Sequence, residues 1–401
     1  MESIREIFKI GQGPSSSHTM GPQTAAQQFV ALHPQAMAFR VTLYGSMAAT
    51  GRGHLTDKAI IAVFNQAQKP VDIVWESQTF LPQHPNGMLF EALDASGKPQ
   101  DSWTTFSIGG GDLSDTGQRG EKAQCYPHSQ MATIIAWCQE HGATFWEYVN
   151  QYESPEIWDY LAEVWRVMKA AVERGLDTEG VIPGGLKLPR KASSYNIKAK
   201  AYQGSMQRRS LTFSYALAVA EENAAGGEIV TAPTCGSSGV LPAVLYLNQK
   251  HYDFSDQRII RALATAGLIG NIIKTNASIS GAEVGCQGEI GSACAMAAGA
   301  SVQLFGGTIA QIEYAAAMGM EHFLGLTCDP IAGLVQIPCI ERNAMAAGRA
   351  IDANMYALLS DGRHLVCFDT VIEAMKRTGH DLPRIYKETA EGGLAYLMKE
   401  K

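Results

Sequence analysis

The sequence predicts two structural classes in one chain: an α+β N-terminal domain followed by an all-α domain. In the first third of the chain, short runs rich in β-branched and aromatic residues alternate with helical stretches. From about Met131 these strand signals fade, and Ala-rich segments with helical periodicity follow one another. A chain of 401 residues is long enough for two domains. We place them at residues 1–150 and 151–401, because helix breakers concentrate between 150 and 200.

Six regular elements are expected in the N-terminal domain. The expected strands are 39–46, 71–77, 87–93 and 104–111, and the expected helices are 20–31 and 56–67. The run "SIGGGD" at 107–112 follows the last strand but lacks the glycine and lysine spacing of a phosphate-binding loop. It therefore predicts a turn.

The rest of the chain is expected to be a series of helices. They are predicted at 131–141, 156–174, 207–225, 237–249, 257–274, 290–304, 307–318, 338–359 and 367–377. The window from Ile290 to Ile312 is free of charge over a membrane-spanning length. Its Gly, Ser and Gln content and the break at Gly306-Gly307 favour a buried helix pair instead, so no membrane segment is predicted.

The composition argues against several classes of partner. With 46% hydrophobic and 18% charged residues, the chain is expected to be compact and globular. Its formal charge of -7, and the lack of any basic cluster longer than Arg208-Arg209, argue against nucleic acid as a partner. The N-terminal sequence lacks the basic-then-apolar order of a secretory signal, so we expect a cytoplasmic protein. Its eight cysteines are then expected to be thiols.

Three cysteines stand beside helix breakers or at predicted helix edges: Cys286 in "GCQG", Cys328 in "TCDP" and Cys339 in "PCIE". A free cysteine is most often a small buried hydrophobic residue. A helix start, however, offers free N–H groups that stabilise a thiolate or the sulfides of an iron–sulfur cluster. The long spacing between these thiols is not that of a ferredoxin or a zinc ribbon. If they hold a cubane cluster, one iron keeps an open position for chemistry.

A serine-rich loop, "GPSSSHTMGP" at 13–22, places hydroxyl groups and His18 before the helix expected at 20–31. Hydroxyl and N–H groups at a helix start can bind a carboxylate, or they can simply cap the helix. The run "TAPTCGSSGV" at 231–240 offers the same two alternatives at another helix entrance.

A second loop, "YGSMAATGRGHLTD" at 44–57, follows a predicted strand and carries His54. A helix start is expected directly after it, at Thr56 and Asp57. A loop histidine is usually a surface residue, but it can also serve as a general base near neutral pH.

Taken together, the motifs resemble those of the iron–sulfur-dependent L-serine dehydratases of the single-chain bacterial type. They are "FKIGQGPSSSHTMGP", "GSMAATGRGHLTD", "SIGGGD", "TAPTCGSSG", "NASISGAEVGCQGEIGSACAMAAG", "CDPIAGLVQIPCIERN" and "ETAEGGLA". The likeness runs from about residue 8 to residue 395. It implies an N-terminal domain similar to the allosteric substrate-binding domain of some phosphoglycerate dehydrogenases, and an all-helical catalytic domain.

The resemblance also implies the site and the reaction. Cys286, Cys328 and Cys339 would hold a [4Fe–4S] cluster. The residues expected to bind or act on substrate are Ser15, Ser16, Ser17, His18, Thr19, His54, Thr56 and Asp57. The expected reaction converts L-serine to pyruvate and ammonia, with His54 preferred over His18 as the base that removes the α-proton. The open iron would take the substrate carboxylate and β-hydroxyl.

Other functions stay open. The chain could be a related lyase acting on L-threonine or L-cysteine, or an iron–sulfur sensor of serine. A pyridoxal phosphate enzyme is disfavoured, since Lys9 lies near serines but no phosphate-cradling loop accompanies it. We expect L-serine as the small-molecule partner, no membrane contact, and a homodimer.

The end of the chain, "EGGLAYLMKEK", departs from the family pattern. Single-chain members often carry a cysteine at the penultimate position, which acts as a self-inhibiting fourth ligand of the cluster. We expect no such cap here.

Overall fold

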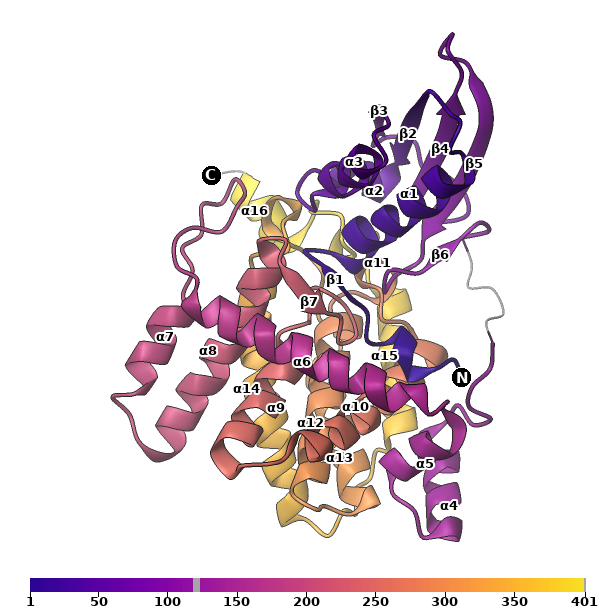
Figure 1. Cartoon of the computed structure of the whole chain (residues 1–401). Helices are drawn as coiled ribbons and strands as arrows, with labels where there is room; N and C mark the ends of the chain where they lie inside the picture. Colours follow the sequence, from indigo (N-terminus) through magenta and orange to yellow (C-terminus); the bar gives the residue numbers. More distant parts are fainter. Residues whose placement is uncertain (118–122, 400–401) are drawn as a thin grey trace.

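The computed structural model describes residues 1–117 and 123–399, and these form two packed parts (Figure 1). An α/β part with a five-stranded sheet sits at one end of a larger, mostly helical part. The predicted fold class, an α+β domain followed by an all-α domain, is confirmed. Residues 400–401, at the end of the tail expected to lack a cysteine cap, lie outside the described residues.

The sheet of the α/β part has the strand order β3-β2-β4-β5-β6. Its elements are α1 (Gly21–Leu32), β2 (Ala38–Tyr44), α2 (Gly45–Thr50), α3 (Thr56–Gln66), β3 (Val71–Glu76), β4 (Gly87–Leu93), β5 (Pro99–Ser107) and β6 (Leu113–Ser114). β2 and β3 run parallel, and the other neighbours are antiparallel. All four predicted strands and both predicted helices are present.

Two expectations for this part need correction. The loop predicted at 44–57 contains helix α2, so β2 ends earlier than expected; Gly45, with a φ of 53°, makes the turn between them. The strand predicted at 104–111 ends at Ser107, because the glycines at 109–111 all take positive φ values. The turn predicted at 107–112 is confirmed.

Aromatic side chains join the sheet to α1 and α3. The ring of Phe39 on β2 lies 5.9 Å from that of Phe29 on α1 and 4.7 Å from that of Phe64 on α3. Because both helices are fixed to the same sheet, the segments that precede them meet. The rings of His18 and His54 consequently lie only 4.6 Å apart.

Over residues 123–399, which the structure describes, the helical part contains all nine helices predicted for it and four more. Its helices are α4 (Met131–His141), α5 (Phe145–Tyr152), α6 (Glu156–Asp177), α7 (Ala192–Ala199), α8 (Gly204–Ala224), α9 (Val240–Tyr252), α10 (Asp256–Asn276), α11 (Gly281–Val284), α12 (Ser292–Leu304), α13 (Ile309–Glu321), α14 (Cys339–Leu359), α15 (Phe368–Asp381) and α16 (Gly393–Lys399). The unpredicted helices α5, α7, α11 and α16 have eight residues or fewer.

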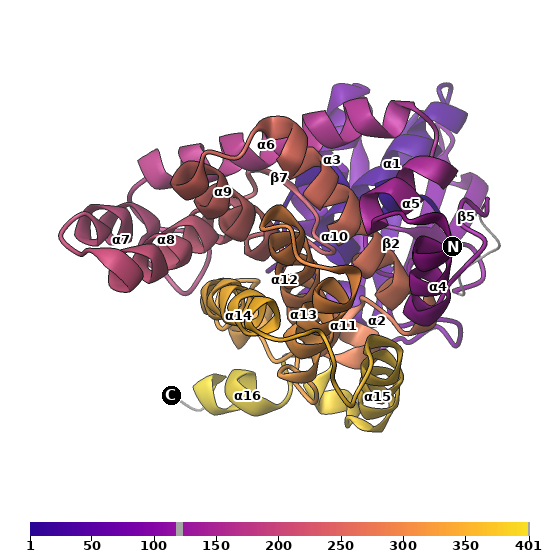
Figure 2. The same ribbon diagram turned by 90° about the horizontal axis from the view of Figure 1, so that it is seen from below.

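Helix α12 forms the centre of the helical part, where α9, α10, α13 and α14 surround it (Figure 2). Every residue of α12 except Gln303 is buried. Gly306, with a φ of 76°, separates it from α13. The predicted buried helix pair is therefore confirmed. Within the described ranges, no helix combines the length and the apolar character that a membrane crossing requires.

The first residues of the chain pack against the helical part. Strand β1 (Ile10–Gln12) pairs antiparallel with β7 (Glu228–Val230), and Ile4, Ile7 and Phe8 are buried in the helical core. Neither short strand was predicted from the sequence. This pairing places the serine-rich loop, which follows β1 directly, against the helical part.

The domain division at residue 150 stays a prediction. The hydrophobic core of the helical part includes side chains from 1–8 and 126–149. The core of the α/β part is formed by side chains between 25 and 92.

A buried ion-pair network joins the glycine turn to the helical part. Asp112, at the end of "SIGGGD", accepts hydrogen bonds from Lys9 and, at 2.9 Å, from Lys274 of α10. Lys274 is 2% exposed and also pairs with Glu2 at 3.0 Å. A buried charge requires such partners, because desolvation penalises it strongly when it is unpaired.

Replacing Asp112 by Ala should destabilise the protein by about 3–5 kcal/mol, because Lys274 then loses a buried counter-charge. Urea denaturation followed by circular dichroism measures the change. Asp72→Ala is the matched control, since Asp72 is exposed on β3, and its effect should stay within about 0.5 kcal/mol. Equal midpoints for the two variants would show that the network does not support the fold.

Candidate active site

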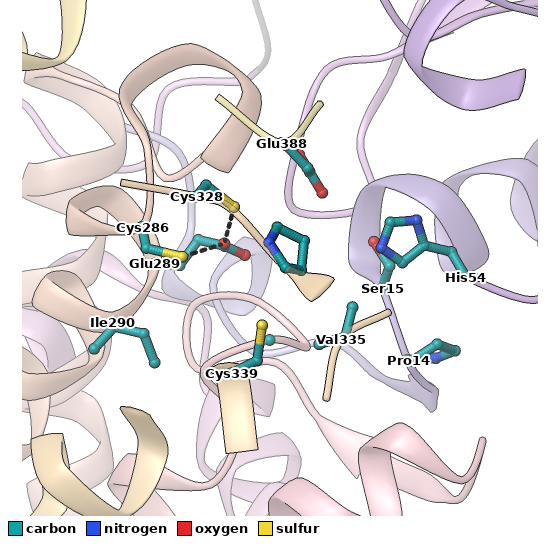
Figure 3. A pocket seen from close by; sticks show the side chains of 12 residues that line it. Pro14, Ser15, His54, Cys286, Glu289, Ile290, Cys328, Val335, Cys339 and Glu388 are labelled. Atoms are coloured by element: carbon teal, nitrogen blue, oxygen red, sulfur yellow. Dashed lines mark hydrogen bonds between the residues drawn. The ribbon is translucent and has the colours of Figure 1, made fainter. Parts of the chain in front are cut away.

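A cavity lies where the two parts of the molecule meet (Figure 3). The residues that line it come from the serine-rich loop, the loop before α3, the entrance of α9, the α11–α12 connection, the loop before α14, and the segment before α16. They are Pro14, Ser15, His54, Gly236, Cys286, Glu289, Ile290, Cys328, Pro330, Val335, Cys339 and Glu388.

The structure brings the three predicted thiols to this cavity. Cys286 precedes the turn Gln287–Gly291 that leads into α12, Cys339 is the first residue of α14, and Cys328 lies in a loop paired with Lys387. All three are buried. The pKa of the Cys328 thiol is raised mainly by a hydrogen bond with Cys286 and secondly by burial. The pKa of the Cys339 thiol is raised mainly by burial.

A carboxylate lies between two of these thiols. Glu289 Oε2 is 3.7 Å from Cys286 Sγ and 3.9 Å from Cys328 Sγ, as the dashed lines in Figure 3 mark. Its Oε1 accepts a hydrogen bond of 2.8 Å from the Thr234 hydroxyl. One donor atom from each of Cys286, Glu289 and Cys328 lies within 4.8 Å of the others, so this set could hold a metal. Burial raises the pKa of the Glu289 carboxyl.

The donors fit an iron–sulfur cluster. Thiolates are the ligands that such clusters prefer, and three of them face one buried cavity. Gly281 leaves room for them, since a Cβ there would meet Glu289 Oε2 at 2.9 Å and Cys328 Sγ at 3.1 Å. The chain is thus shaped closely around its thiol and carboxylate donors.

The glycine that precedes Cys286 has a different task. Gly285 has a φ of 74°, and a Cβ there would meet the carbonyl oxygen of Leu326 at 2.6 Å. Close backbone approach at Gly285 therefore brings the loop of Cys286 beside the loop of Cys328. At Gly285 the group that approaches is therefore the protein's own backbone.

Hydroxyl groups of the serine-rich loop hold His18. The Ser17 hydroxyl is 2.8 Å from His18 Nδ1, and the Ser46 hydroxyl is 3.3 Å from Nε2. The Ser15 hydroxyl accepts a hydrogen bond of 3.1 Å from the backbone N–H of His18. Burial is the main reason that the pKa of His18 is lowered to about 4, so its ring is neutral at neutral pH.

His54 is buried and its two ring nitrogens have no hydrogen-bond partner among the described residues. Burial, and then the neighbouring His18, lower the pKa of His54 well below its usual value. The hydroxyl of Thr19 donates a hydrogen bond of 2.7 Å to the carbonyl of His54, and that of Thr56 donates one to the carbonyl of His18. The two threonines therefore fix the histidine backbones.

The other predicted substrate-binding residues lie at different depths. Ser15 lines the cavity. Ser16 is buried at the start of the turn before α1, and its carbonyl accepts the N–H of Gly21. Asp57 is half-buried in the first turn of α3 and does not line the cavity. Binding roles for all of them stay predictions.

The sequence interpretation missed two carboxylates at this cavity, Glu289 and Glu388. Glu289 follows Cys286 by three residues in "GCQGE", and Glu388 begins "ETAEGGLA", so both stood inside motifs that were noted. Their burial was not visible in the sequence. Burial, and then the charge of Glu289, raise the pKa of Glu388 to about 8.

Comparison with known proteins identifies the family. The model of the serine dehydratase alpha chain matches residues 76–395, and that of the beta chain matches residues 3–70. The chain belongs to the serine dehydratase family. The predicted resemblance to the L-serine dehydratases is therefore confirmed, with alpha-type and beta-type segments in one chain.

Several relatives are similar to this chain over nearly their whole length. An L-serine dehydratase of Streptomyces coelicolor is 42% identical over 98% of each chain. The L-serine dehydratase of Haemophilus influenzae is 40% identical over 98% of this chain and 99% of the relative. L-serine dehydratase 2 of Escherichia coli is 41% identical over 98% of each chain.

Acid should destabilise the metal-free protein through His54. In the unfolded chain a histidine has a pKa of about 6.5, whereas the folded protein holds His54 well below that value. Above pH 6.5 the ring is neutral in both states. Below it, only the unfolded chain binds the proton, so the free energy of unfolding falls with pH. Between pH 7.5 and pH 5, His54→Gln should lose less stability than the unsubstituted protein in urea denaturation, by up to about 2 kcal/mol.

His251→Gln serves as the control, because His251 is exposed on α9. It should follow the unsubstituted protein at both pH values. If His54→Gln does the same, burial does not keep His54 neutral.

Proposed function

We propose that this chain is an L-serine ammonia-lyase that converts L-serine to pyruvate and ammonia. The observation that carries the proposal is one cavity with buried thiols on one side and, on the other, a buried histidine whose ring has no hydrogen-bond partner among the described residues. The names of the full-length relatives agree with this activity.

Cys286, Cys328 and Cys339 would hold a [4Fe–4S] cluster, as they line the cavity together. With three thiolate ligands, such a cluster would leave one iron open and would supply Lewis-acid chemistry for the departure of the β-hydroxyl. Ser15 and His54 line the same cavity as these thiols. The substrate would therefore lie between the thiols and His54.

His54 acts as the base in this proposal. Its ring nitrogens are free to accept a proton, and its lowered pKa keeps it unprotonated at neutral pH. One ring nitrogen takes the α-proton, the electron pair of that C–H bond forms the double bond, and the C–O bond breaks as the β-hydroxyl leaves. The hydroxyl leaves as water by taking up one proton, which balances the proton that His54 has accepted and then gives up. The resulting aminoacrylate tautomerises and hydrolyses to pyruvate and ammonia in water.

Neighbouring groups position this base. Thr19 bonds the backbone of His54, and the hydroxyls around His18 hold the second ring at 4.6 Å. The Ser15 hydroxyl would meet the substrate carboxylate, with Ser16, Ser17 and Thr19 shaping the same turn.

An anaerobic assay of 2-oxo acid release tests the function and its substrate: L-serine and L-cysteine would give pyruvate, and L-threonine would give 2-oxobutanoate. L-Serine should be preferred, but the extra methyl of L-threonine should be disfavoured by only about 1–3 kcal/mol. Release of a 2-oxo acid that requires pyridoxal phosphate, or no release from any of the three, would refute the proposal.

Replacing Cys286, Cys328 or Cys339 by Ser should abolish both cluster binding and turnover. Iron analysis after anaerobic reconstitution should give about four irons per chain for the unsubstituted protein and nearly none for these variants. Cys138→Ser and Cys367→Ser are the controls, since Cys138 lies in the helical core and Cys367 is exposed. Loss of the cluster in Cys125→Ser or Cys235→Ser would contradict the assignment.

His54→Ala should lower kcat by about 10²–10⁴-fold while the cluster spectrum and L-serine binding persist. His18→Ala should instead weaken binding more than it lowers kcat. Exchange of the α-proton of L-serine with deuterated water measures directly whether the base removes that proton. Exchange retained by His54→Ala would show that another group removes the proton.

The homodimer and the cytoplasmic location remain predictions of the sequence. Size-exclusion chromatography with light scattering of the anaerobic protein tests the first.

A further inference from the structure

The carboxylate of Glu388 faces the cavity from the side opposite Cys339, the first residue of α14 (Figure 3). Glu388 is 8% exposed, and its Oε1 lies 3.7 Å from His18 Nδ1. It is a second buried carboxylate of the site, separate from Glu289, which lies between the thiols. The mechanism described above leaves Glu388 without a task.

The backbone holds Glu388 in place by two unusual means. Its φ is 56°, in the left-handed region that a residue with a long side chain rarely adopts. The N–H of Glu388 donates a hydrogen bond of 2.9 Å to the carbonyl of Cys328, and the N–H of Cys328 donates one of 2.8 Å to Tyr386. Strained backbone that neighbouring contacts enforce is concentrated at functional sites.

The Glu388 carboxyl has no permanent cation beside it among the described residues, so burial favours its neutral form until a cation binds. Within the ranges that the structure describes, no lysine or arginine nitrogen lies within 4.0 Å of its carboxylate, and no side chain donates a hydrogen bond to it. The nearest basic group is His18, whose ring is already bound by Ser17 and Ser46. Arg342 is committed elsewhere, to the carbonyl of Thr327 and to Asp329.

We propose that the Glu388 carboxylate binds the α-ammonium group of the amino-acid substrate. This inference rests on the proposed function, because it assigns the recognition of one substrate group at the same site. An ammonium group supplies three donors and the positive charge that a buried carboxylate requires. The thiol side of the cavity and the Ser15 side are left for the hydroxyl and carboxylate of the substrate. Glu388 would therefore select amino acids over hydroxy acids.

The selection has a clear physical basis. A ligand with a hydroxyl in place of the ammonium leaves the buried carboxylate without its counter-charge. Losing one partner of a buried charge pair typically weakens binding by at least about 100-fold. L-Alanine and L-lactate are a suitable pair of probes, since they differ only in this group and neither carries a β-hydroxyl to eliminate.

Calorimetric binding of L-alanine and L-lactate to the anaerobic, cluster-loaded protein tests the proposal. The unsubstituted protein should bind L-alanine at least about 100-fold more tightly than L-lactate. Glu388→Gln should remove most of this ratio, because it should weaken the binding of L-alanine. The binding of L-lactate should be unchanged or tighter. Glu391→Gln is the matched control from the same motif, because Glu391 is exposed, and it should keep the ratio. Iron content and the cluster spectrum should be unaltered in both variants.

Three results would overturn the proposal: equal binding of the two ligands by the unsubstituted protein, a ratio that survives in Glu388→Gln, or an equal loss of both ligands in that variant. The first requires no variant, so misfolding cannot obscure it. Failure of the proposed function gives a different pattern. In that case L-serine yields no pyruvate, while the preference for L-alanine and its dependence on Glu388 persist.

Discussion

The antiparallel pairing of β1 with β7 determines where the two halves of the site meet. Ile10 lies opposite Val230, and the pair is extended by hydrogen bonds between Lys9 and Thr231. The chain leaves β1 toward Pro14 and Ser15, and it leaves β7 toward Thr234, which bonds Glu289. Two strands of three residues each therefore direct both the serine-rich loop and the carboxylate of the thiol side to one cavity.

Burial then sets the chemistry of the groups that meet there. It keeps His18 and His54 neutral, and it raises the pKa values of Glu289 and Glu388. In a water-poor cavity each charge interacts more strongly with its neighbours than it would at the surface. A site of this kind is suited to a small, charged ligand that replaces the missing partners.

Periodicity was sufficient to predict most of the fold from the sequence. Helices such as α6 and α14 are long enough for a repeating apolar face, and the Ala-rich α12 was recognised by its lack of charge. Strands β1 and β7 were missed because three residues carry no measurable alternation. Helix α2 was missed because its six residues lie between glycines, and a segment of that composition is typical of a loop.

The site was predictable where residue type alone carries the chemistry. Thiols and histidines are rare enough that Cys286, Cys328, Cys339 and His54 stood out in their motifs. Carboxylates are common on every surface, so neither Glu289 nor Glu388 was distinguishable before the fold showed them buried at one cavity. Asp57, whose binding role the resemblance implies, is half-buried in the first turn of α3, and that role stays a prediction.

The short β-bridge between Cys328 and Lys387 joins the loop that carries Cys328 to the segment that carries Glu388. Because Cys328 bonds both Tyr386 and Glu388 through the backbone, two hydrogen bonds join the loop of Cys328 to the 384–388 segment. If a ligand at Glu388 changes the affinity of Cys328 for its own ligand, thermodynamic linkage requires the reverse effect to have the same size.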